Sequence, residues 1–424
     1  MRIDRLRITN FKRFASCEFN FDSQFYLIVG DNATGKTSAL DALSIAVDGW
    51  FLGLRGAQTA GSISPEQVHV DPQQFEDRVS FEKQFPVRIE ASGRVLGQDL
   101  TWSRELSSEK GRTTTTNAKN LINVAKEADR KVRAKEAVTL PLICSYGNER
   151  LWFESPHKKI AKKKSSSADL PSRFDGYRDC TEFEIQETDL LDWIRAEISV
   201  SQQRQAETIA LGVMKQAIAS CVEFATSIYY DERYKDLIVA IGKSDFQMFR
   251  NLSDGQRIML TLIGDLAKRV IMLNPQLGRD VLQQTPGIVM IDELDLHLHP
   301  TWQRRVIHDL KRTFPQIQFV VTTHSPQLIG EALPREIRVL DHGSVSTPPR
   351  SFGVDSSRIL EEVMHASPRN IDTKELLSRL AELIDKEDMA GARETLRIVE
   401  EKLGHDDPEV IGATTLIQLL ESTQ

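Results

Sequence analysis

The sequence predicts an α/β fold, in which a mixed sheet carries an antiparallel β lobe, a helical lid insertion and a C-terminal helical segment. Two apolar runs that end in polar residues, 287–293 and 318–324, are typical of buried parallel strands. A glycine-rich loop at 30–37 follows a short apolar segment and precedes a helical pattern. Because open α/β sheets bind ligands at the carboxyl ends of their strands, we expect these segments to form one site.

The N-terminal lobe is predicted to consist mainly of antiparallel strands. Its short apolar or alternating segments have the length and period of strands. They lie at 2–9, 16–30, 67–71, 87–91 and 95–104. Ser92 and Gly93 indicate a hairpin turn between the last two segments. A polar helical pattern then covers 116–136, and the apolar run at 138–146 predicts a buried strand.

The middle of the chain contains an expected insertion. Residues 155–180 include Pro156, five lysines within 158–164, three consecutive serines and Gly176, so we expect a mobile segment without a core of its own. The lysines could contact DNA or RNA phosphates; a solvated loop is the alternative, since no aromatic side chain lies among them. The helical pattern at 187–226 predicts a lid or arm.

The C-terminal segment carries the acidic character of the chain. The net charge is −7, and residues 351–424 contain 16 acidic and 8 basic side chains. The nearly neutral remainder does not indicate a general nucleic-acid binder. Three or four amphipathic helices are predicted over 356–421, and we expect them to dock a partner protein, with a plain helical cap as the alternative. Their apolar positions include Leu376, Leu377, Leu380, Leu383 and Ile384.

Length and composition exclude several classes of protein. A chain of 424 residues is long enough for one large core with insertions, or for two to three lobes. No apolar stretch approaches the roughly 20 residues of a membrane span, and the N-terminus lacks a secretion signal. Four scattered cysteines without a Cys-x-x-Cys pair give neither a disulfide framework nor a zinc knuckle. We therefore expect a soluble, cytoplasmic protein.

The loop Gly-Asp-Asn-Ala-Thr-Gly-Lys-Thr has the spacing and context of a phosphate-binding loop, and an ordinary strand-to-helix turn is the alternative. Gly30 and Gly35 permit a tight turn whose backbone N–H groups and following helix N-terminus attract phosphate oxygens. Lys36 is placed for the β and γ phosphates of ATP, and the Thr37 hydroxyl for Mg²⁺. The residues predicted to bind ATP here are Gly30, Asp31, Asn32, Ala33, Thr34, Gly35, Lys36, Thr37 and Ser38.

Asp292 and Glu293 directly follow the first apolar run. We expect Asp292 to hold Mg²⁺ through water, while Glu293 acts as the catalytic base or positions the attacking water. Two carboxylates that cap a strand are the alternative, which Pro300 weakens because it predicts a helix start shortly afterwards. His324 ends the second apolar run, and we predict that it donates a hydrogen bond to the γ-phosphate.

Two further motifs flank these carboxylates along the chain. His297 and His299 have a spacing seen in metal sites, but no third ligand joins them, and we expect them in a loop that meets a second subunit. Leu-Ser-Asp-Gly-Gln at 252–256 precedes a long amphipathic segment. Ser253 is a natural N-cap residue, and the N–H groups and dipole of that helix predict a second anion site.

Together, these motifs resemble those of ABC-type P-loop ATPase heads. The opening Ile-Thr-Asn-Phe-Lys-Arg-Phe at 8–14 is similar to that of the RecF, SMC and OLD-like branch. The resemblance implies that Ser253, Gly255 and Gln256 of one subunit close on the γ-phosphate held by another. ATP with Mg²⁺ would then join the subunits of a homo-oligomer through sandwich dimers.

The same resemblance leaves two positions open. Arg55 lies where SMC-like proteins carry an arginine near the composite site, and a surface arginine is the equal alternative. The family's glutamine loop should follow the strand that ends near Ser145, but no glutamine is there. Asn148 or Tyr146 would have to take that role, and we predict Asn148 as the ATP-binding residue.

A narrower resemblance is to the PtuA family, the ATPases of Septu-type antiphage systems. It is carried by the segments 146–152 and 174–179 and by the tail from Gly353 through 358–362. It implies an ATP-hydrolysing regulatory subunit of a bacterial antiphage defence complex, which controls a PtuB-like HNH endonuclease docked on the C-terminal helices. The alternative is a RecF-like DNA-binding repair ATPase without a nuclease partner.

On this interpretation the chain divides into four segments. Residues 1–145 are predicted to form the N-terminal half of the ATPase head, with the phosphate-binding loop and the antiparallel lobe. Residues 146–245 would form the basic loop and helical lid, and 246–350 the C-terminal half of the head. Residues 351–424 would form the acidic helical tail for partner docking.

Overall fold

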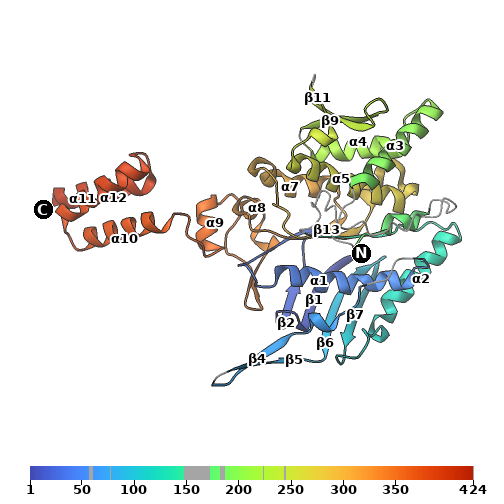
Figure 1. Cartoon of the computed structure of the whole chain (residues 1–424), viewed down its shortest axis with the longest axis horizontal. Coiled ribbons are helices and arrows are strands. Elements are labelled where there is room, and N and C mark those ends of the chain that lie inside the picture. Colours follow the sequence, from blue (N-terminus) through green and yellow to red (C-terminus); the bar gives the residue numbers. More distant parts are fainter. Residues whose placement is uncertain are drawn as a thin grey trace. The chain divides into compact units, whose positions relative to one another are not determined.

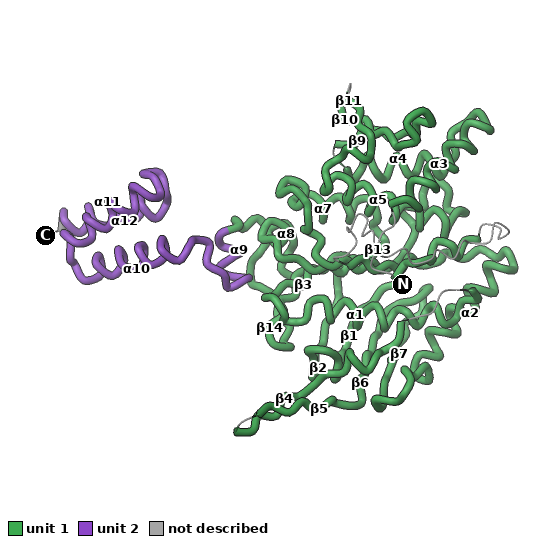
Figure 2. Tube along the Cα trace, viewed as in Figure 1, with its two compact units in different colours: residues 1–356 green, residues 357–424 purple. Residues whose placement is uncertain are grey.

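The structure is a computed structural model that describes residues 1–56, 61–76, 78–147, 172–181, 187–222, 224–242 and 245–423. The chain divides into two compact units, residues 1–356 and 357–424 (Figure 2). The sheets belong to the first unit. The predicted α/β class is confirmed, with a mixed sheet, antiparallel sheets and a C-terminal helical segment.

A six-stranded mixed sheet carries the predicted site. All its strands are parallel except the last in the chain, which pairs antiparallel with its neighbour. In spatial order they are β15 (Ser344–Ser346), β14 (Ile337–Asp341), β3 (Phe25–Val29), β13 (Ile317–Thr322), β12 (Gly287–Ile291) and β8 (Leu142–Tyr146). Every residue of β3, β8, β12 and β13 is buried, as expected for parallel strands covered on both faces.

The antiparallel lobe contains β2 (Phe14–Asn20), β1 (Arg2–Phe11), β6 (Val87–Val95) and β7 (Gln98–Leu106), in that spatial order. The predicted turn at Ser92 and Gly93 is wrong, because both residues pair with β1 inside β6. The turn lies at Leu96 and Gly97, which have φ values of 46° and 83°. Gly93 is needed for a different reason: a Cβ atom on it would lie 2.1 Å from the carbonyl oxygen of Arg2, where the β1 register shifts.

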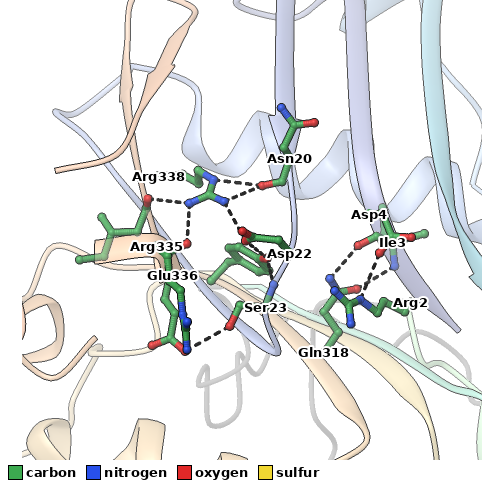
Figure 3. Close-up of polar contacts among 12 residues, drawn as sticks. Arg2, Ile3, Asp4, Asn20, Asp22, Ser23, Gln318, Arg335, Glu336 and Arg338 are labelled. Atoms are coloured by element: carbon green, nitrogen blue, oxygen red, sulfur yellow. Dashed lines mark hydrogen bonds and ion pairs between the residues drawn. The ribbon is translucent and has the colours of Figure 1, made fainter. Parts of the chain in front are cut away.

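Polar side chains join the antiparallel lobe to the central sheet (Figure 3). The amide of Gln318 in β13 donates to the carbonyl of Ile3 at 2.7 Å and accepts from its N–H at 2.8 Å. Arg338 in β14 donates to the carbonyl of Asn20 at 2.7 Å. Because the Gln318 amide satisfies both backbone groups of a buried residue, its loss would leave a donor and an acceptor unpaired inside the protein.

Helices cover both sheets. The first, α1 (Lys36–Val47), contacts β6 of the lobe and β12 and β13 of the central sheet, so it lies between them. α1 begins at Lys36, directly after the loop, and another helix begins at Pro300, as the sequence predicts. Further α-helices of this unit are α2 (Lys119–Arg133), α3 (Glu187–Arg204), α4 (Ile209–Cys221), α5 (Asp254–Leu273), α6 (Val281–Gln284), α7 (Pro300–Thr313) and α8 (Pro326–Gly330). Over the described ranges, none of the helices has both the length and the apolar character that a membrane crossing requires.

Two smaller sheets extend the first unit. β4 (Val70–Gln74) and β5 (Val79–Lys83) form a hairpin where the sequence predicts one strand. β9 (Ala225–Asp231), β10 (Asp236–Ile241) and β11 (Asp245–Met248) form an antiparallel sheet beside α3 and α4, which is missing from the predictions (Figure 1). The helix predicted up to residue 226 therefore ends too late, since the isoleucine and two tyrosines of β9 favour a strand.

Part of the expected insertion is packed. Asn148 and the lysine run at 158–164 lie outside the described residues. The short 3-10 helix Arg173–Tyr177 contacts α5, and the Tyr177 and Cys180 side chains are buried. A Cβ atom on Gly176 would lie 2.7 Å from Cγ of Leu273, so only glycine allows this approach. The prediction of a segment without a core is therefore wrong from residue 173 to residue 180.

The C-terminal segment forms the helices α9 (Ser356–Glu362), α10 (Ile371–Asp385), α11 (Met389–Leu403) and α12 (Pro408–Thr423), as predicted. The predicted apolar face of α10 is also confirmed. Leu380 and Ile384 are buried, and Leu376, Leu377 and Leu383 pack against the same core.

A groove of about 760 Å³ lies between α10 and α12. Apolar residues form most of its walls, including Leu416, whose side chain is 43% exposed. Asp385 and Glu409 line it as well. The second unit therefore combines an apolar groove with an acidic surface.

Candidate functional site

The loop at 30–37 connects β3 to α1, as the sequence predicts. A Cβ atom on Gly30 would lie 2.4 Å from the carbonyl oxygen of Leu340 in β14. A Cβ atom on Gly35 would lie 2.8 Å from the ring of Phe14, and Gly35 also has φ 110°. Close packing therefore requires glycine at both positions, and backbone conformation adds to that requirement at the second.

The Lys36 side chain folds back into this loop. Its Nζ donates to the carbonyl oxygens of Gly30 and Asp31, each at 2.8 Å. Burial lowers the pKa of Lys36, and the nearby charge of Asp292 opposes that shift. The loop carbonyls thus hold the ammonium group at the place where phosphate oxygens could replace them as partners.

Asp292 lies at the carboxyl end of β12, and its carboxylate accepts two hydroxyl groups. Thr37 donates to Oδ2 at 2.9 Å, and Thr322 donates to Oδ1. The residue is buried, and its N–H donates to the carbonyl of Tyr146 at 2.8 Å. The paired carboxylate and Thr37 hydroxyl are hard oxygen ligands, which suits Mg²⁺, an ion that completes its shell with water and phosphate.

Glu293 follows with a left-handed backbone, φ 50°, which is strained for a residue other than glycine. Its N–H donates to the Thr322 hydroxyl at 2.7 Å. The same hydroxyl donates to the carboxylate of Asp292. Thr322 of β13 thus holds the backbone of Glu293 and the side chain of Asp292. His324 lies two residues beyond that threonine, and its N–H donates to Asp295 at 3.4 Å.

A cavity of about 560 Å³ joins these groups. It brings together most of the predicted loop, both carboxylates and His324, whereas Gly30, Asp31 and Thr34 belong to the loop without lining the cavity. The lining residues are Arg13, Asn32, Ala33, Gly35, Lys36, Thr37, Ser38, Asp292, Glu293 and His324.

Arg13 also lines the cavity, although it is not among the residues predicted to bind ATP. It is exposed in the turn between β1 and β2, next to Phe14, whose ring lies against the loop. The neighbouring Lys12 instead pairs with Asp41 of α1. Only the positive charge of Arg13 within the opening motif could have suggested a phosphate contact.

The motif at 252–256 lies apart from the cavity. Ser253 is the N-cap of α5, as predicted: its hydroxyl accepts from the N–H of Gln256 at 3.4 Å, and the Gln256 amide oxygen accepts from the Ser253 N–H at 3.0 Å. A Cβ atom on Gly255 would lie 2.3 Å from the carbonyl oxygen of His297. None of the three motif residues lines the cavity that holds Lys36.

His297 and His299 do not form a metal site with their neighbours. His299 caps α7, since its ring accepts from the N–H of Thr301 at 3.3 Å. Throughout the described part of the chain, no group of three or more His, Cys, Asp and Glu residues could hold a metal ion.

The structure describes Arg55 and Tyr146, two of the residues for which the resemblance leaves the role open. The Arg55 side chain is 76% exposed, its Nε lies 3.3 Å from Oδ2 of Asp129 in α2, and it does not line the cavity. The Tyr146 side chain is buried and donates to Oδ2 of Asp265 in α5 at 2.9 Å, which commits its hydroxyl elsewhere. Asn148 lies outside the described residues.

The chain is similar in sequence to two bacterial ATPase-related proteins. The chain is 37% identical over 181 residues to the retron Ec83 probable ATPase of Escherichia coli, which covers 42% of this chain and 33% of the relative. It is 34% identical over 105 residues to the Septu protein PtuA of Bacillus thuringiensis, which covers 25% of this chain and 26% of the relative. The chain thus spans about a third or less of the length of these relatives.

Among solved structures, the chain is similar to the SMC head domain from Thermotoga maritima, with 16% identity and a TM-score of 0.41 over 82% of this chain and 99% of that one. Residues 1–329 match the family model described as the AAA ATPase domain. That match extends from the first strand past the loop at 30–37, both carboxylates and His324. The chain therefore belongs to the AAA ATPase domain family.

Proposed function

We propose that this chain binds and hydrolyses ATP with Mg²⁺ in a site shared between two copies, as the regulatory subunit of a bacterial antiphage defence complex. One observation carries the shared site. The cavity gathers Lys36, Thr37, Asp292 and Glu293, while Ser253 caps a separate helix that does not line it. A second copy would bring its own capped helix to the open side of the nucleotide.

Each residue has a role in this proposal. Lys36 and the loop N–H groups bind the β and γ phosphates, and Thr37 with Asp292 holds Mg²⁺. Glu293 aligns and deprotonates the attacking water, and His324 donates to the γ-phosphate. The strained backbone of Glu293 supports this assignment, because such strain persists where the surroundings fix a residue in place.

The N-terminus of α5 is suited to the phosphate of a neighbouring copy. Ser253 is exposed, and the first turn of this 20-residue helix adds backbone N–H donors and the positive end of the helix dipole. Ser253, Gly255 and Gln256 would complete the γ-phosphate shell across the interface. ATP would thus hold two copies together, with Arg55 and Asn148 as further predicted ATP contacts.

Mixing two inactive variants tests the shared site. Lys36→Ala removes the side chain that binds the phosphates, and Ser253→Arg blocks the N-terminus of α5. Each variant alone should therefore be inactive. In an equal mixture, each mixed dimer pairs the intact loop of one copy with the intact helix of the other and so has one intact site. We expect roughly a quarter of the wild-type rate of phosphate release if the copies pair at random, and about half if only mixed dimers form.

Ser253→Thr, which keeps an N-cap hydroxyl, serves as the control and should retain most activity. Thermal unfolding of all variants checks that they are folded. A mixture that is no more active than its separate components, although the two variants associate with each other in the presence of ATP, would reject the shared site.

The regulatory part of the proposal concerns a partner nuclease. Similarity to retron ATPases and to PtuA supports a place in bacterial defence. We propose that an HNH endonuclease like PtuB docks on the acidic second unit, in the groove between α10 and α12. Contact of DNA or RNA with the lysines at 158–164, and a cytoplasmic location, remain predictions.

Leu416→Glu tests this docking. The change places a charge in the apolar groove at a side chain that is already 43% exposed, so the fold should tolerate it. We expect the affinity for a co-expressed PtuB-like HNH protein to fall at least about tenfold. Ile371→Glu is the matched control, because Ile371 is 75% exposed and does not line the groove. Equal retention by both variants would place the partner elsewhere.

A further inference from the structure

Tyr146, the last residue of β8, is hydrogen-bonded in two directions. Its carbonyl oxygen accepts from the N–H of Asp292 at 2.8 Å. Its hydroxyl donates to Oδ2 of Asp265, in the middle of α5, at 2.9 Å. Burial, together with the charge of Asp265, raises the pKa of Tyr146 well above its ordinary value, so the hydroxyl keeps its proton. One residue thus connects the edge that carries Asp292, through its backbone, to α5, through its side chain.

Asp265 is held firmly at the α5 end of this connection. Its Oδ2 also accepts from Nε of Arg269, one turn along the helix, at 2.6 Å. The Arg269 guanidinium donates in turn to the carbonyl oxygens of Gly176 and Arg178, at 3.2 Å and 2.7 Å. Because a buried carboxylate and guanidinium are costly to separate, this network resists rearrangement.

A displacement of Asp265 can be transmitted along α5 to the N-terminus of that helix. Every residue from Ile258 to Ala267 is buried, so the helix is packed on all sides along that stretch. Asp265 lies 12 residues beyond Ser253, which is about 18 Å along a continuous helix. The capped end at Ser253 is exposed, and there the helix can contact a neighbouring molecule.

We propose that Tyr146 is a positioning residue that couples the Asp292 edge of the central sheet to the N-terminal end of α5. The proposal rests on the shared site described above. When Mg²⁺ and nucleotide shift the edge at Asp292, Tyr146 transmits the shift through Asp265 to α5. The copy that has bound nucleotide thereby aligns its own Ser253 for the neighbouring site, so occupancy of one cavity prepares the other.

Tyr146→Phe isolates this coupling, because it removes one hydroxyl and leaves the packing and the backbone bond to Asp292 in place. Tyr177→Phe is a matched control. Tyr177 is also buried, and its hydroxyl donates to the carbonyl oxygen of Pro141 at 2.7 Å, but it is bonded to neither Asp292 nor Asp265. Both changes thus remove a buried tyrosine hydroxyl from the same region of the first unit.

Three measurements are made on the full chain: the Kd for Mg·ADP, the kcat and KM for ATP, and ATP-dependent dimer mass in a Glu293→Gln parent. For Tyr146→Phe we expect a Kd and a KM within about twofold of the parent, and a kcat and dimer affinity at least tenfold lower. For Tyr177→Phe we expect the Kd, KM, kcat and dimer affinity to stay within about twofold of the parent. Its melting temperature should fall by about as much as that of Tyr146→Phe.

The outcomes separate this inference from the proposed function. Equal kcat and dimer affinity for the two tyrosine variants, in a parent that dimerises with ATP, would overturn the coupling alone. A weakened Kd for Mg·ADP in Tyr146→Phe would overturn it too, because Tyr146 would then act on nucleotide binding in a single copy. A Glu293→Gln parent that stays monomeric with ATP would overturn the shared site, and the coupling with it.

Discussion

Replacing Lys36 with alanine is expected to abolish nucleotide binding and hydrolysis by this chain. The Lys36 ammonium is buried in the loop, where the carbonyl oxygens of Gly30 and Asp31 hold it at 2.8 Å in the position from which it would bind phosphate. A preorganised positive group of this kind contributes about 10²–10³-fold to kcat. Titration with Mg·ATP and a phosphate-release assay would measure the two losses.

Lys36→Arg sharpens this experiment. It keeps the positive charge, but a planar guanidinium cannot occupy the narrow position between the loop carbonyls in the same way. We therefore expect a large loss here as well, which would separate the geometry of the ammonium from its charge. If Lys36→Ala bound Mg·ATP as tightly as the wild type does, the cavity would not be the nucleotide site.

Replacing Glu293 with glutamine is expected to stop hydrolysis while ATP remains bound. Glutamine has nearly the same shape, and the backbone bond from residue 293 to the Thr322 hydroxyl does not depend on the side chain. Loss of a catalytic base lowers kcat by about 10²–10⁴-fold. Because the bound ATP then persists, the sandwich dimer should accumulate, and light scattering should report a doubled mass with ATP but not with ADP.

Glu331→Gln is the control for this change, since Glu331 lies at the end of α8 and does not line the cavity. It should hydrolyse ATP at the wild-type rate and form no lasting dimer. A Glu293→Gln protein with unchanged turnover would mean that another group activates the water. The alternative of two carboxylates that only cap a strand would then regain support.

The parts of the fold that the sequence predicts are those with a local physical cause. β12 and β13 are continuous apolar runs because both faces of the central sheet are covered, and Asp292 and His324 come directly after them. The N-cap at Ser253 can likewise be predicted from the sequence, because a capping box depends on four consecutive residues. Such features need no knowledge of distant segments.

The features that escape prediction depend on contacts between distant segments. Gly93 resembles a turn residue in the sequence, but it is required by the approach of β1, about ninety positions earlier. Arg13 lines the cavity beside Phe14, whose ring packs on Gly35 more than twenty residues later in the chain. The bond between Tyr146 and Asp265 joins segments more than a hundred residues apart, and neither residue type announces the other.

The contact between Gly255 and the loop after Glu293 affects how this motif can vary in evolution. Any side chain at position 255 would meet the carbonyl oxygen of His297, so folding of a single copy already excludes every other residue there. Invariance of this glycine among homologues would therefore not distinguish a steric demand from a ligand contact. Ser253 is the more informative position, because Asp or Asn could cap α5 equally well, and a strict preference for serine would have to come from the nucleotide.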